Sequence, residues 1–396
     1  MVRRAGHIRQ RAAGTFEVRY TSGTDPLTGR RKTVTITVKG DRKAAEKELR
    51  ARLHALDTGV HVDPSQLTVG QFLAEWLESM TSRVSPKTHE RYSQIVKSVL
   101  IPALGHRLLY KLLPSEIQQT YIKWETSGRR DGKAGGLSPR TRLHIHRTFK
   151  SALKHAVNMQ LLIRNPADGV KPPRIKKATI SVLTVEQSAV LLEAIRGKMI
   201  YWPVLIALTT GMRRGEVGAL RWKHIDFENK TVRVVESIEQ TKKGIRFKAP
   251  KTDRTRAIIL PNYVVEELKT LKVQQERDYA ELKIRHNQDT LILSRYDGTP
   301  FWPSSISHEF HKELLKIPEL PRVRFHDLRH SHATQLLQAG IHPKIAQERL
   351  GHSTITTTLD LYSHVTDTMQ DDAASKIDDA FKSAIKRISV LKYQPG

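Results

Sequence analysis

The sequence predicts a multidomain chain that is mainly α-helical and carries small β elements. Strand-like alternation is confined to two stretches, residues 6–38 and residues 232–260. Elsewhere apolar residues recur at helical spacing over long segments. Two linker-like segments, GVHVDPSQ at 59–66 and the stiff, basic VKPPRIKKAT at 170–179, interrupt these patterns. Over 396 residues these breaks predict three domains, at 1–60, 67–170 and 180–396.

The chain is strongly basic. It has 67 Lys and Arg against 40 Asp and Glu, a net charge of +27, and the excess is largest over residues 67–178, with 20 basic and 7 acidic side chains. Such an excess predicts a polyanion partner, nucleic acid before anionic membrane. A membrane role is not expected, because no apolar run approaches the roughly 20 residues of a spanning helix and no signal-peptide core is present. The absence of cysteine excludes disulfides, thiolate zinc sites and a cysteine nucleophile, and it fits a cytoplasmic location.

Residues 6–38 predict short strands, because apolar and polar residues alternate at 16–20 and again at 34–38 around the turn sequence DPLTG. Asp41 can cap a helix from Arg42 to about Thr58. The simplest assembly is a three-stranded sheet backed by one helix, and the alternative for its function is a small solvated basic domain. Five basic side chains are expected on these strands, where they suit contact with a DNA groove: Arg9, Arg11, Arg19, Arg31 and Lys32.

Residues 67–170 predict an all-helical domain. Thr68, Ser85, Pro114 and Ser138 mark four helix starts, and aromatic and aliphatic residues follow each start at helical spacing. Such apolar stripes are typical of core. The opposite faces are basic and suit a clamp on the phosphates of duplex DNA. The basic residues expected there are Lys87, Arg91, Lys97, Arg140, Arg142, Arg147, Lys150 and Lys154.

Beyond residue 180 the pattern mixes helices and strands. Thr184 can cap a helix, a buried helix covers 202–208, and TTGMRRGE follows it. Strands are predicted at 232–235 and 256–260, and the hairpin between them is expected to present Lys248, Lys251, Arg254 and Arg256. A long amphipathic helix at 262–284 follows, and the tail at 371–388 is again helical in pattern, with a small apolar face.

Residues 322–365 are crowded with groups that can bind a phosphate or move a proton. His326 and Arg329 are three residues apart, so on a helix they share one face. Glycine and proline residues then predict a helix end and the start of a second helix. His352 is expected on the turn after that helix, and Tyr362 follows with polar neighbours. Each residue alone is more often a cap, a surface group or core, so the interpretation depends on the set.

At TTGMRRGEVGALRW, KAPKTDRTRAIIL, HDLRHSHATQLLQAG and LGHSTITTTLDLYSHV together, the sequence resembles the tyrosine recombinases, and within them the phage-type integrases. The four motifs are the specific part of this resemblance. The N-terminal and helical domains are similar to the arm-binding and core-binding domains of that family, and the last domain to its mixed α+β catalytic domain. His352 stands where some members carry Trp.

The resemblance implies a covalent reaction. Tyr362 would be the nucleophile, Arg213 and Arg329 the phosphate clamp, and Lys251 the general acid, with the nearby Lys248 as the alternative. A phenol with a pKa of about 10 is a poor nucleophile at neutral pH, so cationic neighbours must favour its phenolate. Two arginine forks match the charge that develops on the non-bridging phosphate oxygens. A lysine on a hairpin can protonate the leaving 5′ oxygen.

The resemblance also implies His326 and His352 as assisting histidines and Glu216 as the acidic residue that supports Arg213. His326 can take the phenol proton or hydrogen-bond the phosphate, and sequence leaves both roles open. The rival interpretation is a zinc site at His326 and His330, with His332 close by. It is disfavoured because HEFH at 308–311 lacks the spacing of a zinc protease motif and no cysteine is present.

No metal, ATP or other cofactor is expected, since the motifs offer few carboxylates and no P-loop pattern is present. The partners that the resemblance implies are double-stranded DNA with core-type and arm-type sites and three further copies of the chain in a tetramer. The sequence does not decide whether a DNA-bending host protein and an excision factor also take part. The tail helix is expected to dock on a neighbouring copy, with packing on its own domain as the alternative.

The leading function is site-specific recombination that integrates or excises a phage or mobile element, in the cytoplasm and at the nucleoid. A resolvase of chromosome dimers would use the same chemistry, but the basic N-terminal β domain favours an integrase. A catalytically silent DNA-binding regulator is the third reading, and the full set of seven positions argues against it.

Overall fold

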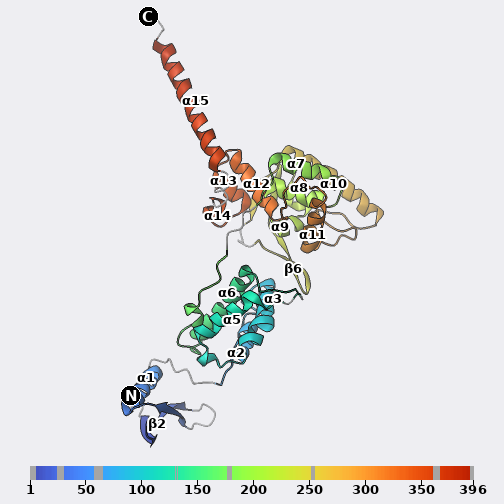
Figure 1. The fold of residues 1–396 in the computed structure, drawn as a ribbon. Helices are drawn as coiled ribbons and strands as arrows, with labels where there is room; N and C mark the ends of the chain where they lie inside the picture. The colour runs from blue at the N-terminus through green and yellow to red at the C-terminus, as the bar shows by residue number, and fades with distance from the viewer. Residues whose placement is uncertain are drawn as a thin grey trace. The chain divides into compact units, whose positions relative to one another are not determined.

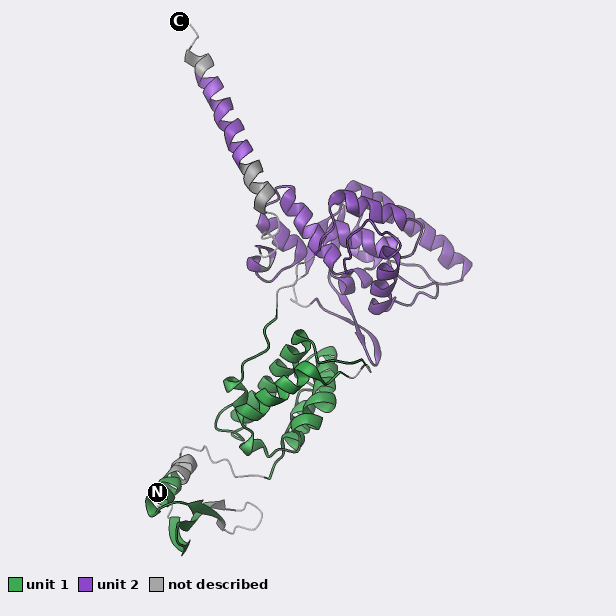
Figure 2. Cartoon of the chain, viewed as in Figure 1, with its two compact units in different colours: residues 1–177 green, residues 178–396 purple. Residues whose placement is uncertain are grey.

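The computed structural model of the protein describes residues 6–24, 31–57, 66–129, 131, 133–175, 181–250, 255–359 and 366–392. The chain forms two compact units, Met1–Lys177 and Ala178–Gly396 (Figure 1, Figure 2). Helices dominate both units and the sheets are small and antiparallel, which confirms the predicted fold class. Within the described ranges, no helix combines the length and the apolar composition that membrane crossing requires.

The first unit begins with a three-stranded sheet backed by one helix. Strands β1 (Gly6–Ala12), β2 (Thr15–Thr24) and β3 (Arg31–Lys39) lie in that spatial order, and α1 (Arg42–Asp57) packs on the sheet. Asp41 caps α1, because its Oδ1 accepts a hydrogen bond from the N–H of Ala44 at 2.8 Å. The apolar side chains under the helix are Phe16, Val18, Tyr20 and Ala45.

The opposite face of this sheet is basic. Arg9 lies opposite Glu17 across the β1–β2 pair, and Arg19 lies two residues from Glu17 on the same face. Arg11 stands at a β-bulge and joins this face, since its Nη2 contacts Glu17 Oε2 at 2.6 Å. Arg9, Arg11 and Arg19 are exposed. Two predicted members of the face have side chains outside the described part of the chain, namely Arg31 and Lys32.

The rest of the first unit is a helical bundle. Its elements are α2 (Val69–Ser79), α3 (Pro86–Ile95), a π-helical turn η1 (Val96–Leu100), α4 (Ile101–Leu104), η2 (Leu109–Lys111), α5 (Pro114–Thr126), α6 (Pro139–Asn158) and η3 (Pro166–Gly169). Thr68, Ser85 and Ser138 accept hydrogen bonds from the first turns of α2, α3 and α6, as their positions predict. The wide turn η1 precedes Pro102, which has no N–H to continue the α-helical ladder. Trp76 and Phe149 are buried in the core of the bundle.

One residue that was expected on the exposed basic face of this bundle lies inside it. Arg142 is buried and forms an ion pair with Glu125, because it shares the inward face of α6 with Ile145 and Phe149, three and seven residues later. Other predicted basic residues are exposed on α3 and α6. Three of them lie close enough to His144 for their charges to lower its pKa, after the larger effect of burial. These three are Arg91, Arg140 and Arg147.

The second unit combines a helical core with two small sheets. Its helices are α7 (Val185–Ala194), α8 (Tyr201–Thr210), α9 (Arg214–Gly218), η4 (Trp222–His224), α10 (Asn262–Glu281), α11 (Pro303–Leu314), α12 (Asp327–Gln338), α13 (Pro343–Leu350), α14 (Ile355–Leu359) and α15 (Thr366–Lys392). The buried helix α8, all apolar over most of its length, sits in the main hydrophobic core of this unit.

The strands of the second unit do not form the single hairpin that was expected between residues 232–235 and 256–260. β4 (Ile225–Asp226), β5 (Thr231–Val234) and β8 (Arg256–Ile259) form one sheet, while β6 (Ser237–Thr241) and β7 (Gly244–Lys248) form a separate hairpin. Arg256 pairs with Val234 and shares the inward side of β8 with Ile258. Its side chain is therefore turned inward and only 10 % exposed, which corrects the expectation that the hairpin presents this residue.

Candidate active site

Arg213 is positioned by the end of α8 and the start of α9. Gly211 ends α8 with a left-handed φ of +66°, and a Cβ at this position would lie 2.5 Å from a side-chain carbon of Leu350. Arg213 follows two residues later as the N-cap residue of α9. Its Nη1 donates to Glu216 Oε1 at 2.8 Å and its Nη2 donates to the carbonyl oxygen of Gly351 at 3.2 Å. The two residues that the sequence predicts as partners are thus in contact.

Glu216 is a buried carboxylate shared by two arginines. Its Oε2 accepts hydrogen bonds from the backbone N–H of Arg213 at 2.9 Å and from Arg256 Nη2 at 2.7 Å. Burial alone would raise the pKa of Glu216, but the hydrogen bond and the positive charge of Arg256, together with Arg213, hold the pKa below its usual value. Glu216 is therefore ionised at neutral pH.

Arg329 joins two segments that are far apart in sequence. It lies in the first turn of α12, is only 3 % exposed, and donates from Nη1 to Gly211 O at 2.7 Å and from Nη2 to Leu350 O at 2.6 Å. Burial first, and the charge of Arg213 second, lower its pKa to about 9. Arg329 therefore remains charged at neutral pH, in a site where water does not screen its charge.

Two predicted histidines flank these arginines. His326 immediately precedes α12, and its ring meets that of His330 edge-on, with 5.3 Å between the ring centroids. His352 follows Gly351 on the turn after α13, and its Nδ1 lies 2.9 Å from Thr358 Oγ1. Desolvation is the main cause that lowers the pKa of each ring to about 4, followed by neighbouring positive charge. Both imidazoles are therefore neutral at neutral pH.

The structure brings together Arg213, Glu216, Arg329 and His352 around one turn, the Leu350–Gly351 turn. Lys251 and Tyr362, predicted as general acid and nucleophile, lie outside the described residues. Lys248, the alternative to Lys251, forms an ion pair with the buried Glu239 on the neighbouring strand.

Sequence reasoning missed one largely buried arginine that contacts this set. Arg256 donates to Glu216 and also from Nε to Arg349 O at 3.1 Å. A signal for it exists in the sequence, because strand alternation places residue 256 on the same side as Ile258.

The geometry disfavours the zinc interpretation. His332 has both ring nitrogens engaged, with Nδ1 2.8 Å from Leu208 O and Nε2 accepting from Arg349 Nε at 3.2 Å. Neither nitrogen is available to a metal. Among the residues that the structure describes, no three His, Asp or Glu side chains are grouped as metal ligands would be.

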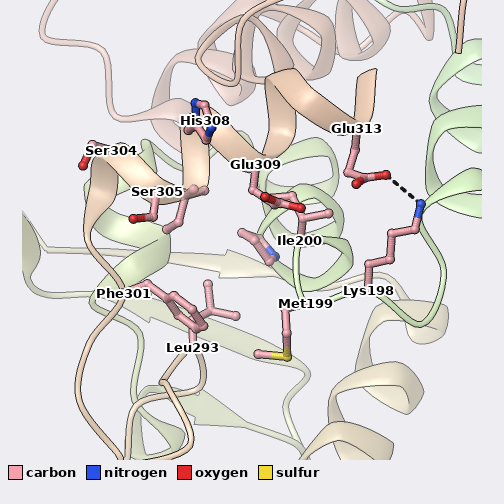
Figure 3. Close-up of a pocket in the computed structure, with 12 residues that line it drawn as sticks. Lys198, Met199, Ile200, Leu293, Phe301, Ser304, Ser305, His308, Glu309 and Glu313 are labelled. Atoms are coloured by element: carbon pink, nitrogen blue, oxygen red, sulfur yellow. Dashed lines mark hydrogen bonds and ion pairs between the residues drawn. The ribbon is translucent and has the colours of Figure 1, made fainter. Parts of the chain in front are cut away.

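Two hollows bear on the location of the site. A hollow of about 530 Å³ lies beside His352 and is lined by residues that include Arg256, Gly351 and Gln347. A larger and mostly apolar hollow of about 990 Å³ lies between α11 and the loop after α7 (Figure 3). In Figure 3, Lys198 reaches Glu313 across its rim, at 2.6 Å. None of the predicted site residues lines the larger hollow, so size alone does not identify the reactive site.

Comparison with known proteins agrees with the motifs. Residues 181–369 match the phage integrase family, and residues 68–124 match the SAM-like N-terminal domain of phage integrases. The ICEBs1 integrase of Bacillus subtilis is 27% identical over 92% of this chain and 97% of its own length. A XerC-like tyrosine recombinase of Caldanaerobacter subterraneus is 26% identical over 86% of this chain and 90% of its own length.

Solved structures show the same fold. The Tn1549 transposon integrase in complex with circular intermediate DNA superposes with a TM-score of 0.64 at 23% identity, covering 79% of this chain and 99% of that chain. A lambda integrase dimer bound to a core site gives a TM-score of 0.55 at 20% identity, covering 89% of this chain and 93% of that chain. The two family matches together span more than half of the sequence. The chain therefore belongs to the phage integrase family of tyrosine recombinases.

Proposed function

We propose that the chain is a site-specific DNA recombinase that integrates or excises a phage or mobile element through a covalent 3′-phosphotyrosine intermediate. One observation carries this proposal. Arg213 and Arg329, from segments more than a hundred residues apart, donate to adjacent carbonyl oxygens of the Leu350–Gly351 turn, next to His352. Two guanidinium groups and a neutral imidazole at one place suit the transition state of phosphodiester cleavage.

Each residue then has a defined task. The Tyr362 oxygen attacks phosphorus, the bond to the 5′ oxygen breaks, and Lys251 protonates that oxygen as it leaves. Arg213 and Arg329 stabilise the charge on the non-bridging oxygens. His326, neutral because its pKa is about 4, accepts the phenol proton or hydrogen-bonds the phosphate. Rejoining reverses the step, with the 5′ hydroxyl of a new strand as nucleophile.

Contacts of two carboxylates support the role of Lys251 as general acid and the role of Glu216 in orienting Arg213. Lys248 forms an ion pair with Glu239 on the neighbouring strand, and this contact holds its ammonium group away from a leaving oxygen. We therefore favour Lys251 over Lys248 as the general acid. Glu216 accepts both from the backbone and from the guanidinium of Arg213, and so it orients that side chain.

The carboxylates of the site argue for chemistry without a metal. A two-metal nuclease needs several Asp or Glu side chains that converge on the site. Glu216 is bound by two arginines, and Asp327 is bound by Arg324 at 2.7 Å. No ATP is needed either, because the phosphotyrosine bond conserves the energy of the broken phosphodiester.

Two basic faces support contact with DNA outside the catalytic unit. We infer that Arg91, Arg140 and Arg147, with Lys87 and Lys150, hold the phosphates of a core-type site, and that the basic face of the β1–β3 sheet binds an arm-type site. Lys87 and Lys150 are each paired with one carboxylate, Glu90 and Asp168, and remain about half exposed. The chain would act in the cytoplasm, at the nucleoid.

We infer that the chain assembles as a tetramer on two DNA sites. A lambda integrase tetramer bound to a Holliday junction, a protein with this fold, supports this inference. Helix α15 carries exposed apolar residues at helical spacing, Ile377, Phe381, Ile385 and Ile388. We infer that this face packs on a neighbouring copy in the assembly. A DNA-bending protein and an excision factor are further partners to test.

The direct test uses a nicked suicide substrate, in which the cleaved strand loses a short fragment and cannot be rejoined. The wild-type chain should leave a covalent protein–DNA adduct on a denaturing gel, in buffer with or without EDTA. Tyr362→Phe should bind the same DNA with unchanged affinity and leave no adduct. Cleavage by Tyr362→Phe would refute the nucleophile assignment, and loss of cleavage in EDTA would revive a metal-dependent nuclease.

One relative favours a second candidate of the same chemistry. The XerC-like recombinase matches over 90% of its own length, so a resolvase of chromosome dimers is the alternative substrate assignment. The basic three-stranded sheet at the N-terminus favours the integrase, because it offers a second DNA contact that a resolvase acting at one site does not need. Recombination that requires DNA outside the core site would favour the integrase over the resolvase.

A further inference from the structure

Arg256 donates three hydrogen bonds to parts of the site, and its side chain is only 10 % exposed. Its Nη1 and Nη2 donate to the two oxygens of Glu216, at 3.3 Å and 2.7 Å, and its Nε donates to Arg349 O at 3.1 Å. The guanidinium also packs on Gly351, where a Cβ would come within 3.1 Å of it.

Three consecutive carbonyl groups at the end of α13 are each bound by a different arginine. Arg256 binds Arg349 O, Arg329 binds Leu350 O, and Arg213 binds Gly351 O. The last carbonyls of a helix have no partner within the helix and carry its negative partial charge. The first of the three arginines thus anchors the turn on which the other two are aligned, and His352 is the next residue along the chain.

The charge of Glu216 makes the second contact of Arg256 important. A buried carboxylate attracts any cation within reach, and the other cation beside it is Arg213, at 2.8 Å. If Arg213 were the sole partner of Glu216, the carboxylate would neutralise the charge of Arg213 and would pull its guanidinium toward Glu216. With Arg256 bound to both carboxylate oxygens, Arg213 keeps net positive charge for a phosphate.

We propose that Arg256 is a positioning residue for DNA strand cleavage: it balances the charge of Glu216 so that Arg213 is free for the scissile phosphate, and it fixes the turn that aligns Arg329 and His352. The proposal rests on the recombinase function proposed above. Arg256 touches neither DNA nor the reacting atoms in this scheme, and it acts through Glu216 and the carbonyl of Arg349.

The test compares Arg256→Met and Arg256→Lys with wild type in single-turnover cleavage of the nicked suicide substrate and in DNA binding by fluorescence anisotropy. Arg256→Met should slow cleavage by about a hundredfold, the order expected when a catalytic group is displaced by about 1 Å, with DNA affinity unchanged. Arg256→Lys keeps the charge but loses the fork, so its defect should be smaller. A wild-type cleavage rate in either variant would overturn the proposal.

A second substitution separates charge balance from simple packing. In Arg256→Met/Glu216→Gln the unbalanced carboxylate is gone, so the double variant should cleave faster than Arg256→Met alone. A role confined to packing predicts that the second substitution adds a further defect, and that result would contradict the proposal. Both results compare variants of the protein in the same cleavage reaction, so they test the role of Arg256. Absence of cleavage by the wild-type chain would be a different result, and it would refute the recombinase function itself.

Lys198→Met is the matched control. Lys198 binds Glu313, a carboxylate that is 5 % exposed and retains Lys316 as a second partner, much as Glu216 is shared by two arginines. Lys198 lies on the larger hollow, away from the predicted site. The control should lose stability without a change in the cleavage rate. If Lys198→Met slowed cleavage as much as Arg256→Met, loss of any cation from a buried carboxylate would explain the defect and the proposal would fail.

Discussion

Arg329 is the residue on which the two halves of the site meet. Its two terminal nitrogens donate to carbonyl oxygens of Gly211 and Leu350, at 2.7 and 2.6 Å. A guanidinium can hold two acceptors in one plane, whereas an ammonium is a single point of charge. Each terminal nitrogen also has a second hydrogen, which leaves donors for a phosphate without breaking either carbonyl contact.

Arg329→Lys should therefore reduce cleavage far more than binding. The lysine retains the charge but reaches only one of the two carbonyls, and we expect a loss of about 3 kcal/mol of transition-state stabilisation, or roughly a hundredfold in rate. Single-turnover cleavage and fluorescence anisotropy on the same DNA measure the two effects. Arg324→Lys is the control, because Arg324 lies three residues before the start of α12, is mostly exposed and pairs with Asp327. Equal rates for the two variants would contradict the bidentate role.

At the level of elements, the site is built from the ends of helices. The C-terminal carbonyls of α8 are bound by His332 and Arg349, which donate to Leu208 O and Thr209 O at 2.8 and 2.9 Å. Those of α13 are bound by arginines from three other segments. Helix ends leave such carbonyls unpaired, so side chains that bind them also fix how α8, α12 and α13 meet.

His332 gives this junction a pH dependence. It is buried, and desolvation followed by the charge of Arg349 lowers its pKa to about 4, below the value of about 6.5 in an unfolded chain. The unfolded state then binds more protons between these two pKa values, so stability is lost as the pH falls through that window. Going from pH 7.5 to pH 5, His332 should lower the free energy of unfolding by about 2 kcal/mol.

Urea unfolding of the wild-type chain and of His332→Asn at the two pH values checks this expectation. Asparagine keeps a donor for Leu208 O but does not titrate, so the variant should lose less stability on acidification than the wild type. His326 and His352 also have lowered pKa values, but they are common to both proteins and cancel in the difference. Identical losses in the two proteins would rule out His332 as the titrating group.

Sequence patterns predicted the elements better than the orientation of single side chains. Cap residues and apolar spacing were sufficient for α2, α6 and α12, because these signals are local. Arg142 and Arg256 were both expected at the surface, but Arg142 is buried and the side chain of Arg256 is only 10 % exposed. Their orientation depends on the rotation of α6 within its bundle and on the pairing of β8 with β5, which are tertiary features. The residues expected to perform the chemistry, Tyr362 and Lys251, lie outside the described part of the chain.

At the scale of the whole molecule, basic charge is spread over parts with different tasks. The segment 1–66 carries 14 basic and 7 acidic residues, and the segment 67–178 carries 20 and 7. The first includes the sheet whose exposed face bears Arg9, Arg11 and Arg19. In the proposed function this sheet holds a second DNA segment, while the helical bundle and the catalytic unit grip the site of cleavage.

Deleting residues 1–60 should therefore weaken binding to DNA that carries the arm-type sequence and leave cleavage of a core-site suicide substrate unchanged. The full-length double variant Arg9→Glu/Arg19→Glu keeps the sheet and should show the same separation, because both side chains are exposed while the core of Phe16, Val18 and Tyr20 is untouched. Each phosphate contact contributes about 0.9 to the slope of log affinity against log salt concentration, so losing two contacts should lower that slope by about 2. Binding titrations over a range of salt concentrations measure it. Loss of core-site cleavage in either protein would mean that the N-terminal sheet serves the reaction itself, and the division of tasks between the domains would be wrong.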